Sequence, residues 1–303
     1  MSARRIFARP ARFAAIAPYL WMLLFFLVPF AFVLKIGLSQ TAIAQPPYTP
    51  VFDFTAGGAA VKQALAALSL ENFRLLVTDN LYIFSYLRSL VVAVTSTAIL
   101  LLIGYPIAYG MARLPQRWQP VAMMLVIVPF WTSFLIRIYA WINILQHDGL
   151  LNKILLALHL VSEPVVWLST DSAMYLGIVY SYLPFMILPL YATLSKMDPA
   201  LEEAAADLGA SPNRVFWLVT FPLSLPGVGA GVLLCFIPIV GEFVIPDLLA
   251  GSNSLMIGQT LWLEFFTNKD WPVASATAIV LLVLLLAPLL LYERLQRRQL
   301  EKG

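Results

Sequence analysis

The sequence is poor in charge, in cysteine and in histidine. Asp, Glu, Lys and Arg make up only 12% of the 303 residues and hydrophobic residues make up 61%, whereas a typical soluble domain is about 25% charged. The single cysteine, Cys235, has no partner for an intrachain disulfide. Neither His147 nor His159 has a cysteine or histidine neighbour at ligand spacing, so no metal site is expected. The composition excludes a disulfide scaffold and indicates an integral membrane protein.

Motifs for catalysis and nucleotide binding are lacking as well. The chain has no glycine-rich phosphate loop, no nucleophile motif and no internal repeat. We therefore expect a protein that is not an enzyme, that binds no cofactor itself and that has no nucleic-acid partner.

Long apolar runs are what the sequence has in abundance. Six runs contain no charged residue, and each has at least about 19 residues, enough at a rise of about 1.5 Å to cross a hydrocarbon core of about 30 Å. Loop 39–86 is the longest connection between them. The sequence predicts an all-α membrane protein of one domain with six transmembrane helices, at about residues 14–35, 87–112, 119–145, 172–195, 222–247 and 271–292.

The first apolar run has two interpretations. Ala42-Ile43-Ala44 could be a cleavage site, and four arginines precede the run as in a signal peptide: Arg4, Arg5, Arg9 and Arg12. Its apolar part is longer than the roughly 7–15 residues of a signal core. We therefore predict an uncleaved first helix.

Lysine and arginine are unevenly distributed over the six-helix arrangement. With a cytoplasmic N-terminus, the outer loops hold only Lys62, Arg74, Lys153 and Lys269, with Arg88 at a boundary. The inner segments hold Arg4, Arg5, Arg9, Arg12, Arg113, Arg117, Lys196, Arg214, Arg294, Arg297, Arg298 and Lys302. Basic residues favour the cytoplasmic side, so both termini and loop 196–221 are predicted there, with loop 39–86 in the periplasm. The outer loops are then acidic, which either concentrates cations or simply follows from the shortage of lysine and arginine.

Two charged residues lie within the predicted helices, directly after charge-free runs, and share one predicted depth near the outer boundary. Arg137 and Glu242 are both roughly 25–30 Å from the inner surface at about 1.5 Å per residue. One hypothesis is that Glu242 attracts a cationic substrate. The other is an Arg137–Glu242 ion pair that joins two helices, or simple snorkelling to the interface.

Aromatic residues cluster near the same depth. Trp131, Tyr139 and Tyr180 are the candidates for a substrate path, together with Glu242 and Asp247. A ring face next to a carboxylate is a common way to bind an ammonium group. The alternative is that these rings belong to an interfacial belt or to core packing.

The polar loop between the fourth and fifth runs predicts a helix, a turn and a second helix. Asp198 with Pro199 forms a helix start, and Glu202 and Glu203 favour that positive end. Gly209 ends the first helix. Ser211 and Pro212 repeat the start for the second helix.

This loop resembles the EAA motif of importer-type ABC permeases. Glu203, Ala204, Ala205 and Gly209 match the motif, and Val219-Thr220-Phe221-Pro222 stands for its closing I-x-L-P. The resemblance implies the type I ABC importer permease fold and a coupling helix that docks in a groove of an ATPase. The coupling residues would be Glu202, Glu203, Ala204, Ala205, Asp207, Gly209 and Pro222. An ordinary amphipathic loop helix is the alternative.

Further segments resemble the polyamine permeases of bacterial ABC importers, most closely the putrescine type. They are residues 130–141, 241–247, 256–258 and 265–272. The resemblance implies an inner-membrane, multi-pass permease for putrescine or spermidine. The step Gly241-Glu242-Phe243 is also similar to that of iron, thiamine and sulfate permeases, so ferric iron, thiamine or another small organic ion remains an alternative cargo. An ion-coupled secondary transporter is the alternative of another class.

The same resemblance implies a set of partners. These are a second, similar permease subunit, a dimer of ATP-binding subunits that holds the ATP, a periplasmic polyamine-binding protein, and the membrane lipid around the helices.

Overall fold

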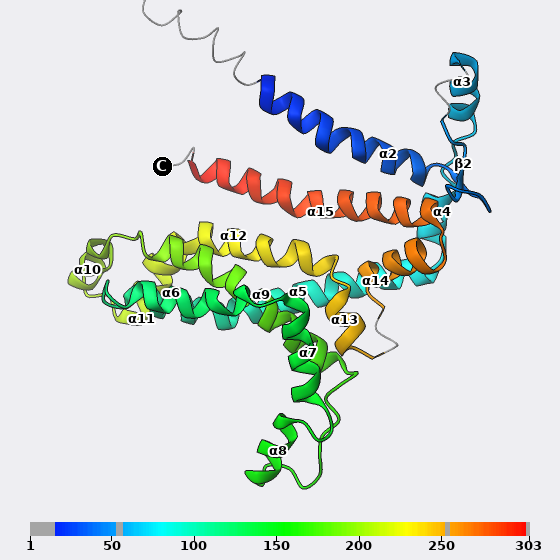
Figure 1. Ribbon diagram of the computed structural model, residues 1–303. Helices are drawn as coiled ribbons and strands as arrows, with labels where there is room; N and C mark the ends of the chain where they lie inside the picture. The colour runs from blue at the N-terminus through cyan, green and yellow to red at the C-terminus, as the bar shows by residue number, and fades with distance from the viewer. Residues whose placement is uncertain (1–15, 53–56, 252–254, 301–303) are drawn as a thin grey trace, which may run out of the picture. The chain divides into compact units, whose positions relative to one another are not determined.

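The computed structural model describes residues 16–52, 57–251 and 255–300 and is shown in Figure 1. These residues are almost wholly helical, with one two-stranded antiparallel ribbon among them. The chain divides into two compact units, residues 1–80 with 261–284 and residues 81–260 with 285–303.

Five helical segments in the described residues are long and apolar enough to cross a membrane. A sixth crossing is formed if a pair of helices with an 89° bend, Gln119–Trp131 and Phe134–Ala157, counts as one span. The prediction of a mostly helical protein with multiple spans is confirmed, with five or six spans rather than a firm six. The five straight spans are Ile16–Gly37, Asn80–Arg113, Asp171–Leu194, Pro212–Val240 and Trp271–Arg294.

The first unit consists of the first apolar helix, the loop after it and the segment around residue 270. Asn72 fastens the loop to the end of this helix, because its side-chain amide donates to the carbonyls of Gly37 (2.8 Å) and Ser39 (2.7 Å). The elements are η1 (Leu23–Leu27), α2 (Val28–Gly37), β1 (Gln40–Thr41), β2 (Tyr48–Thr49), α3 (Gly58–Ala66), α4 (Glu71–Thr78), η4 (Leu263–Thr267) and the first part of α15 (Trp271–Leu300).

Lys35 holds the ribbon of this unit against α2. Its ammonium nitrogen lies 4.3 Å from the centre of the Tyr48 ring and 4.8 Å from that of Phe52, and it donates to the carbonyl of Pro50. The cation is therefore satisfied within the loop that follows its own helix.

The second unit carries the candidate functional residues. Its elements are α5 (Asn80–Arg113), α6 (Gln119–Ile127), η2 (Val128–Trp131), α7 (Phe134–Leu145), α8 (Leu150–Ala157), α9 (Asp171–Leu194), α10 (Pro199–Asp207), α11 (Pro212–Val215), η3 (Phe216–Thr220), α12 (Phe221–Val240), α13 (Val244–Leu249), the start of α14 (Ile257–Trp262) and the last part of α15. In Figure 1, α10 lies at one end of α9 and α12, and α13 lies at the other end of α12.

Two glycines one helical turn apart bring α12 into close contact with α9. A Cβ atom at Gly227 would lie 2.5 Å from the hydroxyl oxygen of Thr193 and 3.0 Å from the carbonyl oxygen of Pro189. A Cβ atom at Gly231 would lie 2.8 Å from the sulfur of Met186. This is the small-residue spacing that allows helix backbones to approach closely in a membrane.

The third predicted helix, residues 119–145, is not continuous. It ends as α6 at Ile127, continues as the 3₁₀ segment η2, and restarts as α7 after an extended backbone at Thr132 and Ser133. Pro129 lies in η2 and has no N–H to donate, which favours a break at this point. The result is the 89° bend.

The fifth predicted helix, residues 222–247, differs at both ends. The helical segment begins earlier, at Pro212, and α12 ends at Val240. Residues 241–243 form a short break before α13. This break places Glu242 between two helices instead of inside one.

Candidate coupling helix and cation site

Local capping signals determine the bounds of α10. The carboxylate of Asp198 accepts a hydrogen bond from the N–H of Ala200 (3.0 Å), and Pro199 occupies the first turn. At the other end the N–H of Gly209 donates to the carbonyl of Ala206 (2.8 Å), and that of Ala210 donates to Ala205 (3.1 Å). Gly209 has φ of +83°, which a residue with a Cβ rarely adopts. The predicted helix and its glycine end are confirmed.

The start of the next helix lacks the expected side-chain cap. Ser211 precedes Pro212 as predicted, but its hydroxyl makes no capping hydrogen bond. The wide π-helical turn η3 then leads to Pro222, which is exposed and has no N–H to donate. Pro222 thus lies inside a continuous helical segment, and the non-helical part of loop 196–221 is shorter than predicted.

One face of α10 is exposed and apolar. The exposed fractions of Leu201 and Leu208 are 49% and 89%, and Ala204 is exposed between them. These three residues follow the spacing of one helix face. Glu203 and Asp207 are also exposed, whereas Ala205 is half-buried. A helix that carries exposed leucines beside charged residues has the character of a protein contact surface.

Glu202 lies on the other side of α10 and contacts the rest of the unit. Its carboxylate forms an ion pair with Arg113, at the end of α5, through both oxygens, and accepts a hydrogen bond from the hydroxyl of Thr220 (2.7 Å). Burial raises the pKa of Glu202, but the hydrogen bonds from Thr220 and Arg113 and the charge of Arg113 outweigh it. The pKa therefore lies below the usual value of a glutamate.

Glu242 is held at the break between α12 and α13 by neutral donors. The hydroxyl of Tyr182, on α9, donates to Oε2 (2.5 Å), and the backbone N–H groups of Val244 and Ile245 lie 3.0 and 3.4 Å from Oε1. The side chain is half-buried. Among the described residues, no ion pair includes Glu242. The geometry leaves a carboxylate whose charge has no protein counterion there.

The predicted ion pair between Arg137 and Glu242 is not formed. The guanidinium of Arg137 instead lies over the rings of Phe130 (4.6 Å) and Phe134 (5.8 Å). Its Nε and Nη1 atoms are buried without a hydrogen-bond partner among the described residues. The bend between α6 and α7 explains the difference, because equal depth along straight helices no longer implies proximity when one helix turns by 89°.

Aromatic rings fill the space between the two charged groups. Phe185 lies 6.0 Å from Tyr182 and packs edge-on against Phe130 at 5.2 Å. Tyr182 was not among the aromatic residues predicted for the substrate path. Its spacing of three from Phe185 was the available signal, since residues three apart share a helix face.

The other predicted path residues lie elsewhere in the unit. Trp131 and Tyr139 are 76% and 54% exposed, and Asp247 is also exposed. Tyr180 packs edge-on against Trp141, with ring centres 5.4 Å apart. The structure therefore groups Glu242 with Tyr182 and Phe185 and not with these four residues.

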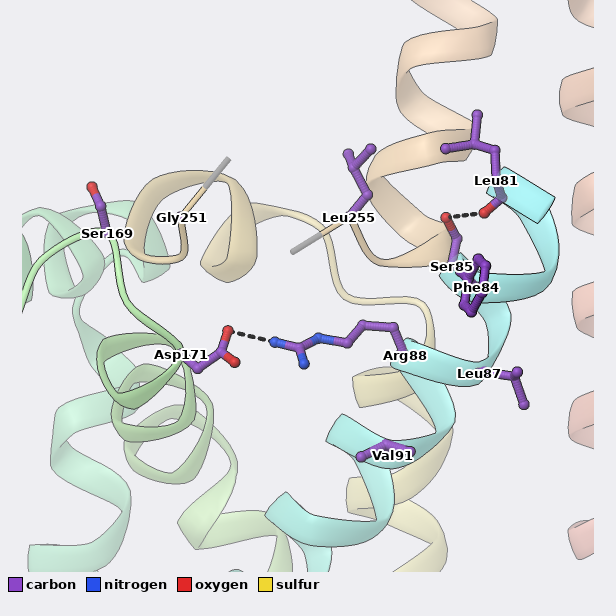
Figure 2. A pocket seen from close by; sticks show the side chains of 10 residues that line it. All are labelled: Leu81, Phe84, Ser85, Leu87, Arg88, Val91, Ser169, Asp171, Gly251 and Leu255. Atoms are coloured by element: carbon purple, nitrogen blue, oxygen red, sulfur yellow. Dashed lines mark hydrogen bonds and ion pairs between the residues drawn. The ribbon is translucent and has the colours of Figure 1, made fainter. Parts of the chain in front are cut away.

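A pocket of about 900 Å³ lies beside the first turns of α5, the start of α9 and the loop after α13 (Figure 2). Arg88, on α5, and Asp171, on α9, form an ion pair across it. Arg88 was predicted at a boundary, but no pattern in the sequence indicated that it pairs with Asp171. Because this cation is already matched, the pocket has a weaker claim than Glu242 to bind a charged ligand.

Comparisons with known proteins identify the family. Residues 101–301 match the family described as binding-protein-dependent transport system inner membrane component. The chain is 42% identical over 229 residues to the spermidine/putrescine transport system permease protein PotB of Escherichia coli strain K12, an alignment that covers 76% of this chain and 83% of that protein. It is 40% identical over 227 residues to PotB of Haemophilus influenzae, with 75% and 79% covered.

A solved structure supports the fold. The chain superposes with a TM-score of 0.68 on a bacterial ABC transporter involved in the import of the acidic polysaccharide alginate, and 95% of each chain is covered. The sequence identity is 17%, so this likeness concerns the fold alone. Fold, apolar helices and sequence agree that this multi-pass inner-membrane chain belongs to the family of binding-protein-dependent transport system inner membrane components.

Proposed function

We propose that the chain is the permease subunit of an ABC importer that carries polyamines, putrescine in the first place and spermidine in the second. The observation that carries this proposal is Glu242, a half-buried carboxylate held by Tyr182 and two backbone N–H groups with no basic partner among the described residues. Similarity to the spermidine/putrescine permeases named PotB supports the cargo.

Glu242 and its neighbours would bind the ammonium group of the substrate. The neutral donors fix the carboxylate without cancelling its charge, so it attracts a cation. Tyr182 contacts the carboxylate and Phe185 lies 6.0 Å from the Tyr182 ring, and a ring face would add a further attraction for an ammonium group. The aliphatic part of a polyamine fits the apolar surroundings. Putrescine, a diamine, and spermidine, a triamine, would differ in the second contact that each requires besides Glu242.

α10 would connect the permease to the energy source. Leu201, Ala204 and Leu208 form a narrow apolar face that would enter a groove of an ATP-binding subunit on the cytoplasmic side, and Glu203 and Asp207 flank it. The importer would be completed by a pair of ATP-binding subunits, a second permease and a periplasmic binding protein. Both ends of this chain would be cytoplasmic, and loop 39–86 would be periplasmic. ATP binding would then shift the populations of two permease conformations.

Uptake measurements test the cargo and the role of Glu242. Cells that express the complete importer with Glu242→Gln should take up labelled putrescine at least about tenfold more slowly, because a hydrogen bond to a charged group contributes about 1.5–3 kcal/mol. The level of the protein in the membrane should not change. Glu163→Gln, in an exposed loop, is the matched control for loss of a carboxylate.

Two results would contradict the proposal. Unchanged uptake of putrescine and spermidine when the subunit is removed would exclude a polyamine cargo. Loss of the assembled complex in the Glu242→Gln variant, at the same expression, would make Glu242 a structural residue instead.

A further inference from the structure

Three helical elements meet at Glu202. Arg113 is the last residue of α5, Glu202 lies in the first turn of α10, and Thr220 is the last residue of η3. The carboxylate contacts Arg113 through both oxygens and accepts the hydroxyl hydrogen of Thr220. A single side chain therefore ties α10 to the ends of two long helices.

This contact is more than an exposed surface ion pair. The side chain of Glu202 is 19% exposed and Thr220 is 1% exposed, although Arg113 retains 46%. Exposed ion pairs contribute little because water screens them. Here the carboxylate is largely withdrawn from water, one guanidinium nitrogen of Arg113 contacts both of its oxygens, and the Thr220 hydroxyl gives it a second partner.

The receiving side of the contact is rigidly packed. Arg113 lies over the ring of Tyr109 at 4.9 Å. Phe216 packs edge-on against both Tyr105 (5.8 Å) and Tyr109 (5.7 Å). Tyr105 in turn shares a hydrogen bond with Ser224 (2.9 Å). The last turns of α5 and the start of α12 thus form one packed surface to which Glu202 is attached.

Open space borders the ion pair. Two open pockets, of about 250 and 290 Å³, adjoin it, and both are lined by Tyr109, Arg113, Glu202 and Thr220. Because side chains do not fill this space, the polar contact helps to hold α10 in position. It also sets the rotation of α10 about its axis, because Leu201, Ala204 and Leu208 lie on a different face.

We propose that Arg113, Glu202 and Thr220 form a positioning joint that orients α10 and passes its displacement to α5 and α12 together. This inference rests on the proposed function of α10 as the contact for an ATP-binding subunit. The three residues do not contact the substrate. They act through α10, so their loss uncouples ATP hydrolysis from transport. ATP hydrolysis and transport each remain possible, but fewer substrate molecules are transported per ATP.

A charge exchange in the complete importer tests the joint. The purified complex, with its ATPase and binding protein, is reconstituted in liposomes, and the number of putrescine molecules transported per ATP hydrolysed is measured. Arg113→Glu and Glu202→Arg should each lower this ratio by about tenfold, within the range of typical coupling energies. The double exchange Arg113→Glu with Glu202→Arg should restore at least about half of it, because the pair is re-formed with its charges reversed.

Two milder variants control for misfolding. Thr220→Val and Glu202→Gln keep the side-chain volume and should lower the ratio in the same direction without loss of the complex. Arg117→Glu, an exposed charge in the same loop as the end of α5, is the matched control and should equal the parent.

The possible outcomes separate the joint from the proposed function. A ratio that stays at the parent value in all assembled single variants overturns the joint alone. A lowered ratio that the double exchange does not restore also overturns it, because the effect then does not arise from the pair. A parent chain that supports no ATP-driven uptake overturns the proposed function and the joint with it.

Discussion

Glu202 lies near the start of α12 and Glu242 lies just after its end. The protein provides these two carboxylates with different kinds of hydrogen-bond partner. Glu202 has a counterion from its own chain, Arg113, and a hydrogen bond from Thr220. Glu242 has the hydroxyl of Tyr182 and two backbone N–H groups, all of them neutral. Under the proposed function, Glu202 would serve the structure, whereas Glu242, which has only neutral partners, would be available to a cation from outside the chain.

Charge reversal should separate the two carboxylates most clearly. Glu242→Lys places a cation where the substrate ammonium would bind, and the repulsion of several kcal/mol between like charges should lower uptake by about a hundredfold or more. Loop 196–221, at the other end of α12, should stay as resistant to protease as in the parent. Uptake assays and limited proteolysis of the same preparations provide the measurement.

Glu202→Lys serves as the counterpart in this comparison. It brings a second cation next to Arg113, so α10 should detach and loop 196–221 should become sensitive to protease. If Glu242→Lys has this effect, or if Glu202→Lys lowers uptake without it, the division between structural and ligand-binding carboxylates is wrong.

Removing the neutral donor of Glu242 should have a smaller effect. Tyr182→Phe deletes the hydroxyl at 2.5 Å, and loss of a hydrogen bond to a charged group costs about 1.5 kcal/mol, which corresponds to roughly tenfold in the KM for putrescine uptake. Tyr180→Phe is the matched control, since that ring packs edge-on against Trp141. Equal KM values for the two variants would remove Tyr182 from the site.

The smallest effect concerns pH. The pKa of Glu202 lies below the ordinary value of about 4.3, so the stabilisation that it provides is complete above that value and is lost as the pH falls through the lower folded-state pKa. The contribution is about 1 kcal/mol or less, since Arg113 is 46% exposed. Hydrogen exchange of residues 199–207 in the purified protein should show protection that decreases at the acid end of this range. The Glu202→Gln variant should lack this dependence.

Local features of the coupling region were predictable from the sequence. Asp198 with Pro199 and the positive φ of Gly209 act within one helical turn, so neighbouring residues contain the whole signal. The apolar runs predicted most of the spanning helices for the same reason, because length and hydropathy are properties of a single segment.

Contacts between distant segments were not predictable in this way. Arg113 and Glu202 are 89 positions apart, and no local pattern indicates that they meet. For Arg137 and Glu242 the sequence supplied only a depth, and that depth assumed straight helices. The 89° bend between α6 and α7 removes this assumption, and a proline in a spanning helix does not by itself determine the size of a kink.

The glycines of α12 have a consequence for the cation site. Gly227 and Gly231 lie directly against α9, so we expect α9 and α12 to move together instead of sliding along each other. Tyr182 lies on α9, and Glu242 lies in the break that follows α12. If the two helices move as one body, the Tyr182 hydroxyl and the Glu242 carboxylate stay in contact.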